Sequence, residues 1–148
     1  MYKNIAQPDA ATVSRGMYSD SNFESDLMNS YAWYTAVYFL QKFDNRANKE
    51  SLKPYSRQNS LNTKSDGLAS QGTNNLSDTR KQDVICNVWD MASNCYEWTT
   101  ETYSSPDYPC IFRGEKYNDS SNSTSSRNNL YITGRKLEDI SFRTLLYL

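Results

Sequence analysis

Apolar residues repeat with the period of an α-helix in one segment of the chain, where they mark a single face. The side chains on that face are Trp33, Ala36, Val37, Leu40 and Phe43. Asn29 or Ser30 is placed to cap the first turn. The pattern predicts one main helix over about residues 30–43 that packs into a core by this face.

Alternation of apolar and polar residues predicts short strands elsewhere. Residues 97–99 and 111–114 have this pattern, and a further short strand is expected near residues 13–18. Residues 140–148 predict one half-buried strand, because alternate positions form an apolar face that Thr144 interrupts. The apolar residues of that face are Ile140, Phe142, Leu146 and Leu148.

The remaining segments are polar. Residues 1–25 are expected to form an irregular N-terminal arm of the same domain, and residues 44–82 a long surface excursion. Residues 118–129 contain only Asn, Asp, Ser, Thr and Arg. Since an apolar strand follows them, this stretch is held at both ends, which favours a recognition surface over a free linker.

The composition favours one domain. A length of 148 residues is enough for a core of its own, and 12 tyrosines, 5 phenylalanines and 3 tryptophans supply most of its large apolar surface. The formal net charge of −1 gives no support for bulk attraction to nucleic acid. No segment is apolar and long enough for membrane insertion, and no signal peptide is visible.

Histidine is absent from the sequence. This removes the usual general base, any Ser–His or Cys–His nucleophile pair and most zinc sites. The three cysteines, Cys86, Cys95 and Cys110, are an odd number without CxxC spacing. We expect three buried thiols, and one disulfide plus a free thiol is the alternative.

The run Asn87–Thr99, NVWDMASNCYEWT, crowds two tryptophans, a tyrosine and two carboxylates into thirteen residues. It resembles the N-V-W/Y-D-M/L-A-G-N-V-W-E-W-T segment of the formylglycine-generating-enzyme (sulfatase-modifying-factor) family, whose fold is related to C-type lectins. Further pieces follow in the family's order. They are Arg113-Gly114 with Tyr117 for R-G-G-S-W/Y, Ser126-Arg127 for S-R, and Ser141-Phe142-Arg143 for G-F-R.

The resemblance covers about residues 27–148 and implies an α+β, C-type-lectin-like fold. Such a fold is loop-rich, with short antiparallel strands beside the main N-terminal helix. We therefore expect one lectin-like domain over residues 26–148, to which the arm of residues 1–25 belongs. The resemblance assigns as scaffold Trp89, Asp90, Asn94, Glu97, Trp98, Arg113, Gly114, Arg127, Phe142 and Arg143.

Large aromatic residues flank Asp90 and Glu97. We expect these carboxylates to hydrogen-bond backbone amides or the guanidinium groups of Arg113 and Arg143. The alternative is a structural calcium site that includes Asn94 and Glu97, since amide and carboxylate oxygens suit this cation and family members often carry calcium near this run. No other cofactor is expected.

The family's oxidases bind copper through two cysteines just before the A-R element. The equivalent residues 117–127 contain no cysteine, and Cys110 lies on the far side of the predicted strand. No histidine can supply an iron or copper site instead. The resemblance therefore implies the scaffold without the oxidase chemistry, and the chain is expected not to be an enzyme.

Residues 113–148 also resemble the C-terminal region of the variable proteins of diversity-generating retroelements, which often use this lectin-like domain. These retroelements mutate adenines, so an Asn codon can become one for Ser, Asp, Tyr, Thr, Ile, Arg or Leu. Glu115 and Lys116 do not arise from an Asn codon. The resemblance implies a hypervariable ligand-binding surface within about residues 113–140. Its residues are Glu115, Lys116, Asn118, Asp119, Ser121, Asn122, Asn128, Asn129, Leu130, Tyr131, Thr133 and Arg135.

Tyr, Ser and Asn are also the residues of adaptable paratopes, because Tyr offers rigid amphipathic area and Ser and Asn offer hydrogen bonds. We interpret the chain as a non-catalytic receptor-binding protein that recognises a protein or glycan from a phage particle or bacterial cell surface. The alternatives are an enzyme of the sulfatase-modifying-factor family with altered chemistry and a structural or assembly domain of a phage. The oligomeric state does not follow from the sequence.

Overall fold

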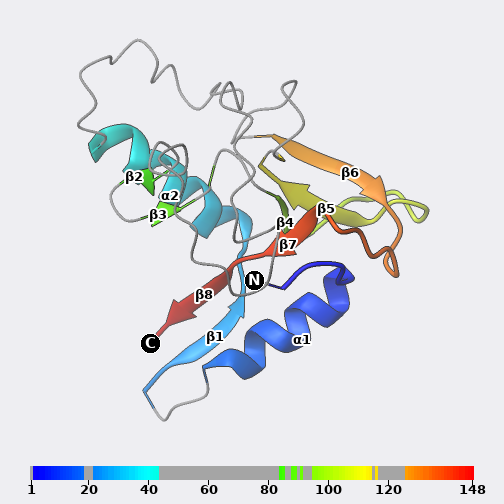
Figure 1. Cartoon of the computed structure of the whole chain (residues 1–148), viewed down its shortest axis with the longest axis horizontal. Coiled ribbons are helices and arrows are strands. Elements are labelled where there is room, and N and C mark those ends of the chain that lie inside the picture. Colours follow the sequence, from blue (N-terminus) through cyan, green and yellow to red (C-terminus); the bar gives the residue numbers. More distant parts are fainter. Residues whose placement is uncertain are drawn as a thin grey trace. The chain divides into compact units, whose positions relative to one another are not determined.

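The structure, a computed structural model, describes residues 2–18, 22–43, 84–85, 88–89, 91, 95–114, 116 and 126–148. Over these residues the chain forms two helices and several small sheets, which is an α+β architecture, as the sequence predicts. In chain order (Figure 1) the elements are α1 (Gln7–Met17), β1 (Glu24–Leu27), α2 (Ser30–Phe43), β2 (Val84–Ile85), β3 (Val88–Trp89), β4 (Tyr96–Thr102), β5 (Cys110–Arg113), β6 (Arg127–Tyr131), β7 (Ile140–Phe142) and β8 (Thr144–Tyr147).

Contacts divide the chain into two compact units. One unit holds residues 34–95 and 114–126, and within it β2 and β3 form an antiparallel pair. The other, here called the strand-rich unit, holds residues 2–33, 96–113 and 127–148. It contains α1, the first turn of α2, β1 and the strands β4 to β8.

The predicted main helix is confirmed as α2, which spans Ser30–Phe43. The Asn29 side-chain oxygen accepts a hydrogen bond of 2.9 Å from the backbone N–H of Ala32, so Asn29 is the cap. Trp33 and Val37 are buried, as their places on the apolar face require. The side chains of Leu40 and Phe43 lie outside the described residues.

Four strands of the strand-rich unit form a sheet in the order β6-β5-β4-β7. The strands predicted near residues 97–99 and 111–114 are confirmed as β4 and β5, which pair antiparallel with Trp98 opposite Phe112. β6 adds antiparallel to β5. The sheet differs from the antiparallel expectation at β7, which runs parallel to β4 with Tyr96 opposite Ile140.

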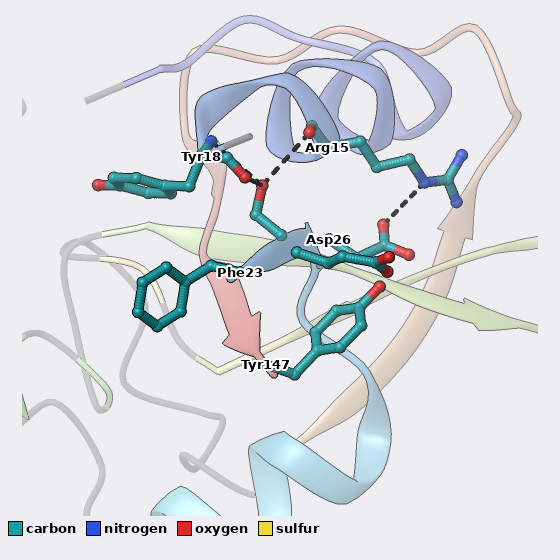
Figure 2. A pocket seen from close by; sticks show the side chains of 7 residues that line it. Arg15, Tyr18, Phe23, Asp26 and Tyr147 are labelled. Carbon is teal, nitrogen blue, oxygen red and sulfur yellow. Dashed lines mark hydrogen bonds and ion pairs between the residues drawn. The ribbon is translucent and has the colours of Figure 1, made fainter. Parts of the chain in front are cut away.

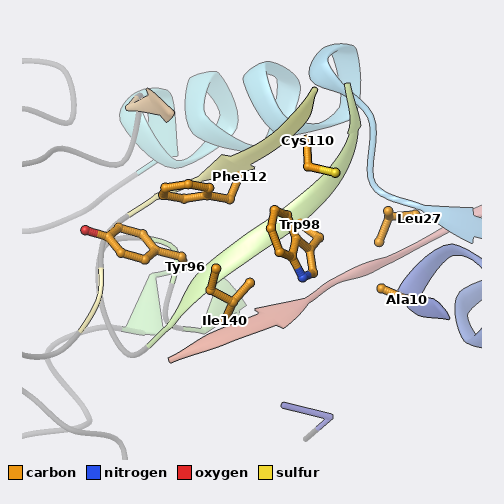
Figure 3. Close-up of a cluster of buried hydrophobic side chains, with 7 residues drawn as sticks. All are labelled: Ala10, Leu27, Tyr96, Trp98, Cys110, Phe112 and Ile140. Carbon is orange, nitrogen blue, oxygen red and sulfur yellow. The ribbon is translucent and has the colours of Figure 1, made fainter. Parts of the chain in front are cut away.

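One face of this sheet carries the hydrophobic core (Figure 3). Trp98 is fully buried there, and its indole N–H donates a hydrogen bond of 2.8 Å to the backbone oxygen of Ile5. The Phe112 ring meets those of Tyr96 and Trp98 at centroid distances of 4.7 and 6.0 Å. The core cluster consists of Ala10, Leu27, Tyr96, Trp98, Cys110, Phe112 and Ile140.

The expectation of an irregular N-terminal arm with a strand near residues 13–18 is wrong, because α1 occupies Gln7–Met17. Pro8 stands in the first turn, where its missing N–H costs nothing. Ala10 and Ser14, four residues apart, form the buried face of the helix. The Ser14 hydroxyl donates a hydrogen bond of 2.9 Å to Thr144 Oγ1. The side chains of the buried face are small and one is polar, so apolar periodicity does not reveal the helix.

The C-terminal run is two strands in two sheets rather than the single strand expected. Residues 140–142 form β7 beside β4, whereas residues 144–147 form β8, which pairs antiparallel with β1. The chain changes sheets at Arg143, whose backbone oxygen accepts a hydrogen bond of 3.0 Å from the N–H of Met28. The predicted common face is lost at this change, so that Ile140 is buried and Leu148 is 95% exposed.

Candidate binding surface

An ion pair across the face of the sheet opposite the core links β4 to β5. Arg113 donates from Nε to Glu101 Oε1 at 2.8 Å and from Nη2 to Glu101 Oε2 at 2.9 Å. The Arg113 side chain is 1% exposed and that of Glu101 is 11% exposed. This two-point geometry fixes the orientation of both groups and matches the planar guanidinium to the carboxylate.

The same carboxylate reaches β6. Arg127 Nε donates to Glu101 Oε2 at 2.7 Å, and Arg127 Nη2 donates to the Thr102 carbonyl at 3.3 Å. Arg113 and Arg127 stand opposite each other in the β5–β6 register. Glu101 therefore holds both arginines, and we call this set of three residues the Glu101 clamp.

The electrostatics of the clamp stabilise the ionised form of Glu101. Burial alone raises the pKa of this carboxyl group, but the hydrogen bonds from Arg113 and Arg127 and their positive charges outweigh it, so the pKa lies below its ordinary value. Glu101 is therefore ionised at neutral pH, and its negative charge is shared by two guanidinium groups.

A second ion pair joins β4 to the turn between β7 and β8. Arg143 donates from Nε to Glu97 Oε2 at 2.8 Å and from Nη2 to Glu97 Oε1 at 2.6 Å. The sequence-based expectation that Glu97 binds an arginine is confirmed with Arg143. Arg113, the other arginine considered for this role, binds Glu101 instead.

The Glu101 clamp brackets residues 114–126, which contain the first half of the predicted variable residues, and the other half follows Arg127. Arg113 ends β5 and Arg127 begins β6, so residues 114–126 leave and re-enter the sheet at directly opposed positions. Gly114 has a φ of 79°, which favours glycine at the point where the chain leaves β5. The two ends of residues 114–126 therefore lie at paired positions of the sheet, whereas the sequence predicts only that the polar stretch 118–129 is held at both ends.

The predicted variable residues fall into two groups. Glu115, Asn118, Asp119, Ser121 and Asn122 lie outside the described residues, and Lys116 is described as half-buried. The second group lies on β6 or just after it. Leu130 is 64% exposed, Thr133 and Arg135 are exposed, and Asn128, Asn129 and Tyr131 are half-buried.

The second group is not uniformly turned to solvent. The Tyr131 ring packs on Phe112 at 5.2 Å and on Trp98 at 6.2 Å between centroids, so it closes one end of the core. Asn128 stands opposite Phe112, and its Nδ2 is the buried side-chain atom without a hydrogen-bond partner among the described residues. Leu130, Thr133 and Arg135 are consequently the described positions that present most of their surface to a ligand.

Thr133 also contacts the core through a cysteine. Burial raises the pKa of the Cys110 thiol, and a hydrogen bond with the Thr133 side chain partly offsets this. Cys110 is 1% exposed and Cys95 is also buried, in line with the expectation of buried thiols. Cys86 lies outside the described residues.

The scaffold residues assigned from the sequence are placed as follows. Trp98 is in the core, and Phe142 is half-buried with its ring 5.5 Å from that of Tyr2. Trp89 is in β3, with its side chain outside the described residues, and Asp90 and Asn94 are outside them too.

The calcium alternative stays a prediction, because Asn94 lies outside the described residues. Both carboxylate oxygens of Glu97 accept hydrogen bonds from Arg143, so a cation there would have to displace a guanidinium group. Within the described ranges, no three Asp, Glu, Cys or His side chains gather as metal ligands.

Glu101 is the functional residue that sequence reasoning did not single out. A signal was present, because Glu97, Thr99 and Glu101 alternate along one strand and so share a face. What the sequence does not supply is the pair of arginines opposite, which come from β5 and β6 and are brought together only by strand register.

Comparison with protein-family models, with curated proteins and with solved structures gave no match. Over the described part of the chain, neither helix is long and apolar enough to cross a membrane.

Proposed function

We propose that the chain is a non-catalytic binding protein that presents a diversified surface on a lectin-like scaffold. The observation that carries the proposal is the Glu101 clamp, which holds both ends of the polar segment 114–126 at opposed positions of two paired strands. A segment held in this way can vary in side chains without losing its place, because the clamp lies outside the varied positions.

The scaffold part of the proposal is supported by where the family-like residues lie. Trp98 fills the core, Glu97 binds Arg143, and Arg113 anchors the start of the polar segment. In a lectin-like member of the formylglycine-generating-enzyme family, such residues would form the frame beneath the loops. Their joint placement around β4 is what a shared scaffold requires.

The binding part is supported by the chemistry of the surface. Leu130, Thr133 and Arg135 are exposed on or after β6, next to a segment rich in Asn and Ser. Exposed substitutions cost little stability, usually within about 0.5 kcal/mol, so this surface can change without unfolding the protein. Side chains of these types suit a protein or glycan ligand.

Diversification is tested in the coding DNA. We expect a near-copy of the segment for residues 113–148 beside a reverse-transcriptase gene, differing from it at adenines. In a population of cells, substitutions should gather in the codons of the variable residues and spare those of Glu101, Arg113 and Arg127. Variation spread evenly over these codons would contradict the proposal.

Binding is tested with a glycan array and a panel of intact bacterial cells. We expect the wild-type chain to bind a subset of them, and the triple variant Leu130→Ser, Thr133→Ser, Arg135→Ser to lose or change that subset. The control is the double variant Tyr103→Ser, Tyr108→Ser, because these tyrosines are also exposed, at 46% and 49%, and lie in the connection between β4 and β5. Equal effects of both variants would argue against a surface on β6.

A further inference from the structure

A cavity of 450 Å³ opens at the end of α1, within the strand-rich unit (Figure 2). It is lined by Arg15 and Tyr18 at the end of the helix, by Phe23, Glu24, Ser25 and Asp26 at β1, and by Tyr147 of β8. Among the described residues, neither the Glu101 clamp nor the predicted variable surface contributes to this lining. The cavity is therefore a second candidate site, distinct from the surface on β6.

Three aromatic rings stand around this cavity. Figure 2 shows the rings of Tyr18 and Phe23 on one side and that of Tyr147 on the other. The three residues are 54%, 47% and 43% exposed, so each ring keeps part of its surface open to a ligand. Aromatic faces carry partial negative charge and attract cations within about 6 Å of the ring centre.

Carboxylates complete the lining. Glu24 stands opposite Tyr147 in the β1–β8 register, and Asp26 lies two residues further on the same face. Asp26 Oδ1 pairs with Arg15 Nε at 3.1 Å. Two carboxylates and one guanidinium group give the lining a net negative charge. Arg15 pairs with Asp26, so no lining guanidinium is left to pair with Glu24.

Ser25, which also lines the cavity, lies against carbonyl groups at the end of α1, and its Oγ accepts a hydrogen bond of 3.2 Å from the Tyr18 N–H. Ser25 Oγ lies 2.7 Å from the carbonyl oxygen of Ser14, 3.3 Å from that of Arg15 and 3.1 Å from that of Tyr18. A hydroxyl has one hydrogen to donate, so it cannot satisfy three carbonyl groups together. These carbonyls belong to the C-terminal end of α1, where the helix dipole is negative and favours cations.

The Tyr147 phenol responds to the same environment. Its pKa is raised above the ordinary value, first by desolvation and then by the hydrogen bond to Glu24 and the negative charges of Glu24 and Asp26. The charge of Arg15 acts in the opposite direction and does not cancel the effect. The cavity thus disfavours an added negative charge, as a site for a cation should.

We propose that this cavity binds an organic cation, an alkylammonium group held between the rings of Tyr18, Phe23 and Tyr147 and neutralised by Glu24. The group can belong to a free quaternary amine or to a lysine side chain of a partner protein, because both present the same charge on an alkyl stem. The proposal is independent of the diversified surface on β6.

The test is a titration of the isotope-labelled full chain, followed by two-dimensional NMR. The probes are choline, the neutral isostere of choline in which carbon replaces nitrogen, and a short peptide containing lysine or trimethyl-lysine. We expect saturable shifts of the amides of Tyr18, Phe23 to Asp26 and Tyr147 with the cationic probes, weakened by salt, and none with the isostere. Tighter binding of choline or of the peptide then identifies the source of the cation.

Two variants test the lining. Phe23→Leu removes one ring and is expected to weaken choline binding about three-fold. Glu24→Gln removes a carboxylate and should weaken it in low salt and have little effect in high salt. The control Tyr108→Leu changes an aromatic residue of similar exposure, 49% against 47% for Phe23, outside the cavity and should leave binding unchanged.

Equal binding of choline and its neutral isostere would overturn the proposal, since it would make the cavity merely apolar. So would the absence of saturable shifts with every cationic probe, or unchanged binding in both Phe23→Leu and Glu24→Gln. The amide spectrum of each variant reports its folding in the same experiment, and Glu24→Gln leaves the aromatic lining intact if Phe23→Leu is misfolded.

Discussion

Arg113 and Glu101 meet through two parallel hydrogen bonds of 2.8 and 2.9 Å, with the guanidinium group almost wholly buried. A buried guanidinium is costly unless a carboxylate neutralises it, so this pair governs the stability of the β4–β5 connection. Because Arg127 shares the same carboxylate, the pair also sets where β6 begins.

Replacing Glu101 by Gln should therefore lower the free energy of unfolding by about 3 kcal/mol, because a buried charge loses its carboxylate. Urea unfolding followed by circular dichroism measures the change. The matched control is Lys136→Gln, which also alters one charge but breaks a surface pair of 3.4 Å to Asp9 whose side chains are 55% and 57% exposed. We expect Lys136→Gln to lower the free energy of unfolding by only about 0–1 kcal/mol. Similar losses in the two variants would show that the clamp is no stronger than a surface pair.

Acid should release the stabilisation that Glu101 provides. Its pKa in the folded protein is lowered from the ordinary value of 4.5, so the stabilisation is complete above pH 4.5 and is lost as the pH falls through the folded-state pKa. The stability difference between wild type and Glu101→Gln should be constant from pH 7 to pH 5 and shrink below pH 4.5. Urea unfolding of both proteins across this range measures it. A difference that stays constant at pH 3 would refute the assignment.

The buried face of α1 consists of small residues, so a larger side chain there is expected to lower the stability of the protein. Ala10 is fully buried, so Ala10→Leu should cost about 1–3 kcal/mol through overpacking. Thr12→Leu, on the exposed side of the same helix, should change stability by about 0.5 kcal/mol at most. Thermal unfolding compares the two, and an N-terminal arm that does not pack would give no difference between them.

Neighbouring positions of β6 should differ sharply in their tolerance of substitution. Leu130→Ser is expected to leave the melting temperature nearly unchanged, since this side chain is 64% exposed. Tyr131→Ser should destabilise by roughly 2 kcal/mol, because the ring packs on Phe112 and Trp98 and is half-buried. If Tyr131→Ser proved as mild as Leu130→Ser, Tyr131 would belong with the freely variable positions.

How far the sequence predicts the fold depends on the size of the side chains that mark each element. α2 was predicted because large apolar residues such as Trp33 repeat at helical spacing, with Asn29 at the cap. α1 was not, because Ala10 and Ser14 mark its buried face. A helix that packs through small residues leaves little trace in hydrophobic periodicity.

Long-range pairing explains most of the remaining differences. The break at Arg143 arises because β7 pairs with β4 and β8 pairs with β1, choices that no local pattern contains. The sequence predicts backbone amides, Arg113 or Arg143 as partners of Glu97, and the structure selects Arg143. The role of Glu101 was not predicted, because it depends on the register that brings Arg113 and Arg127 together.

The opposed positions of Arg113 and Arg127 have a practical consequence for engineering. Because the two ends of the intervening segment already meet in the sheet, the cost of lengthening that segment is the entropy of closing a longer loop, about 0.6 kcal/mol for each doubling of its length. A peptide of another origin could be spliced between these arginines at a small thermodynamic cost. The β5–β6 pair is thus a natural insertion point for grafting foreign epitopes.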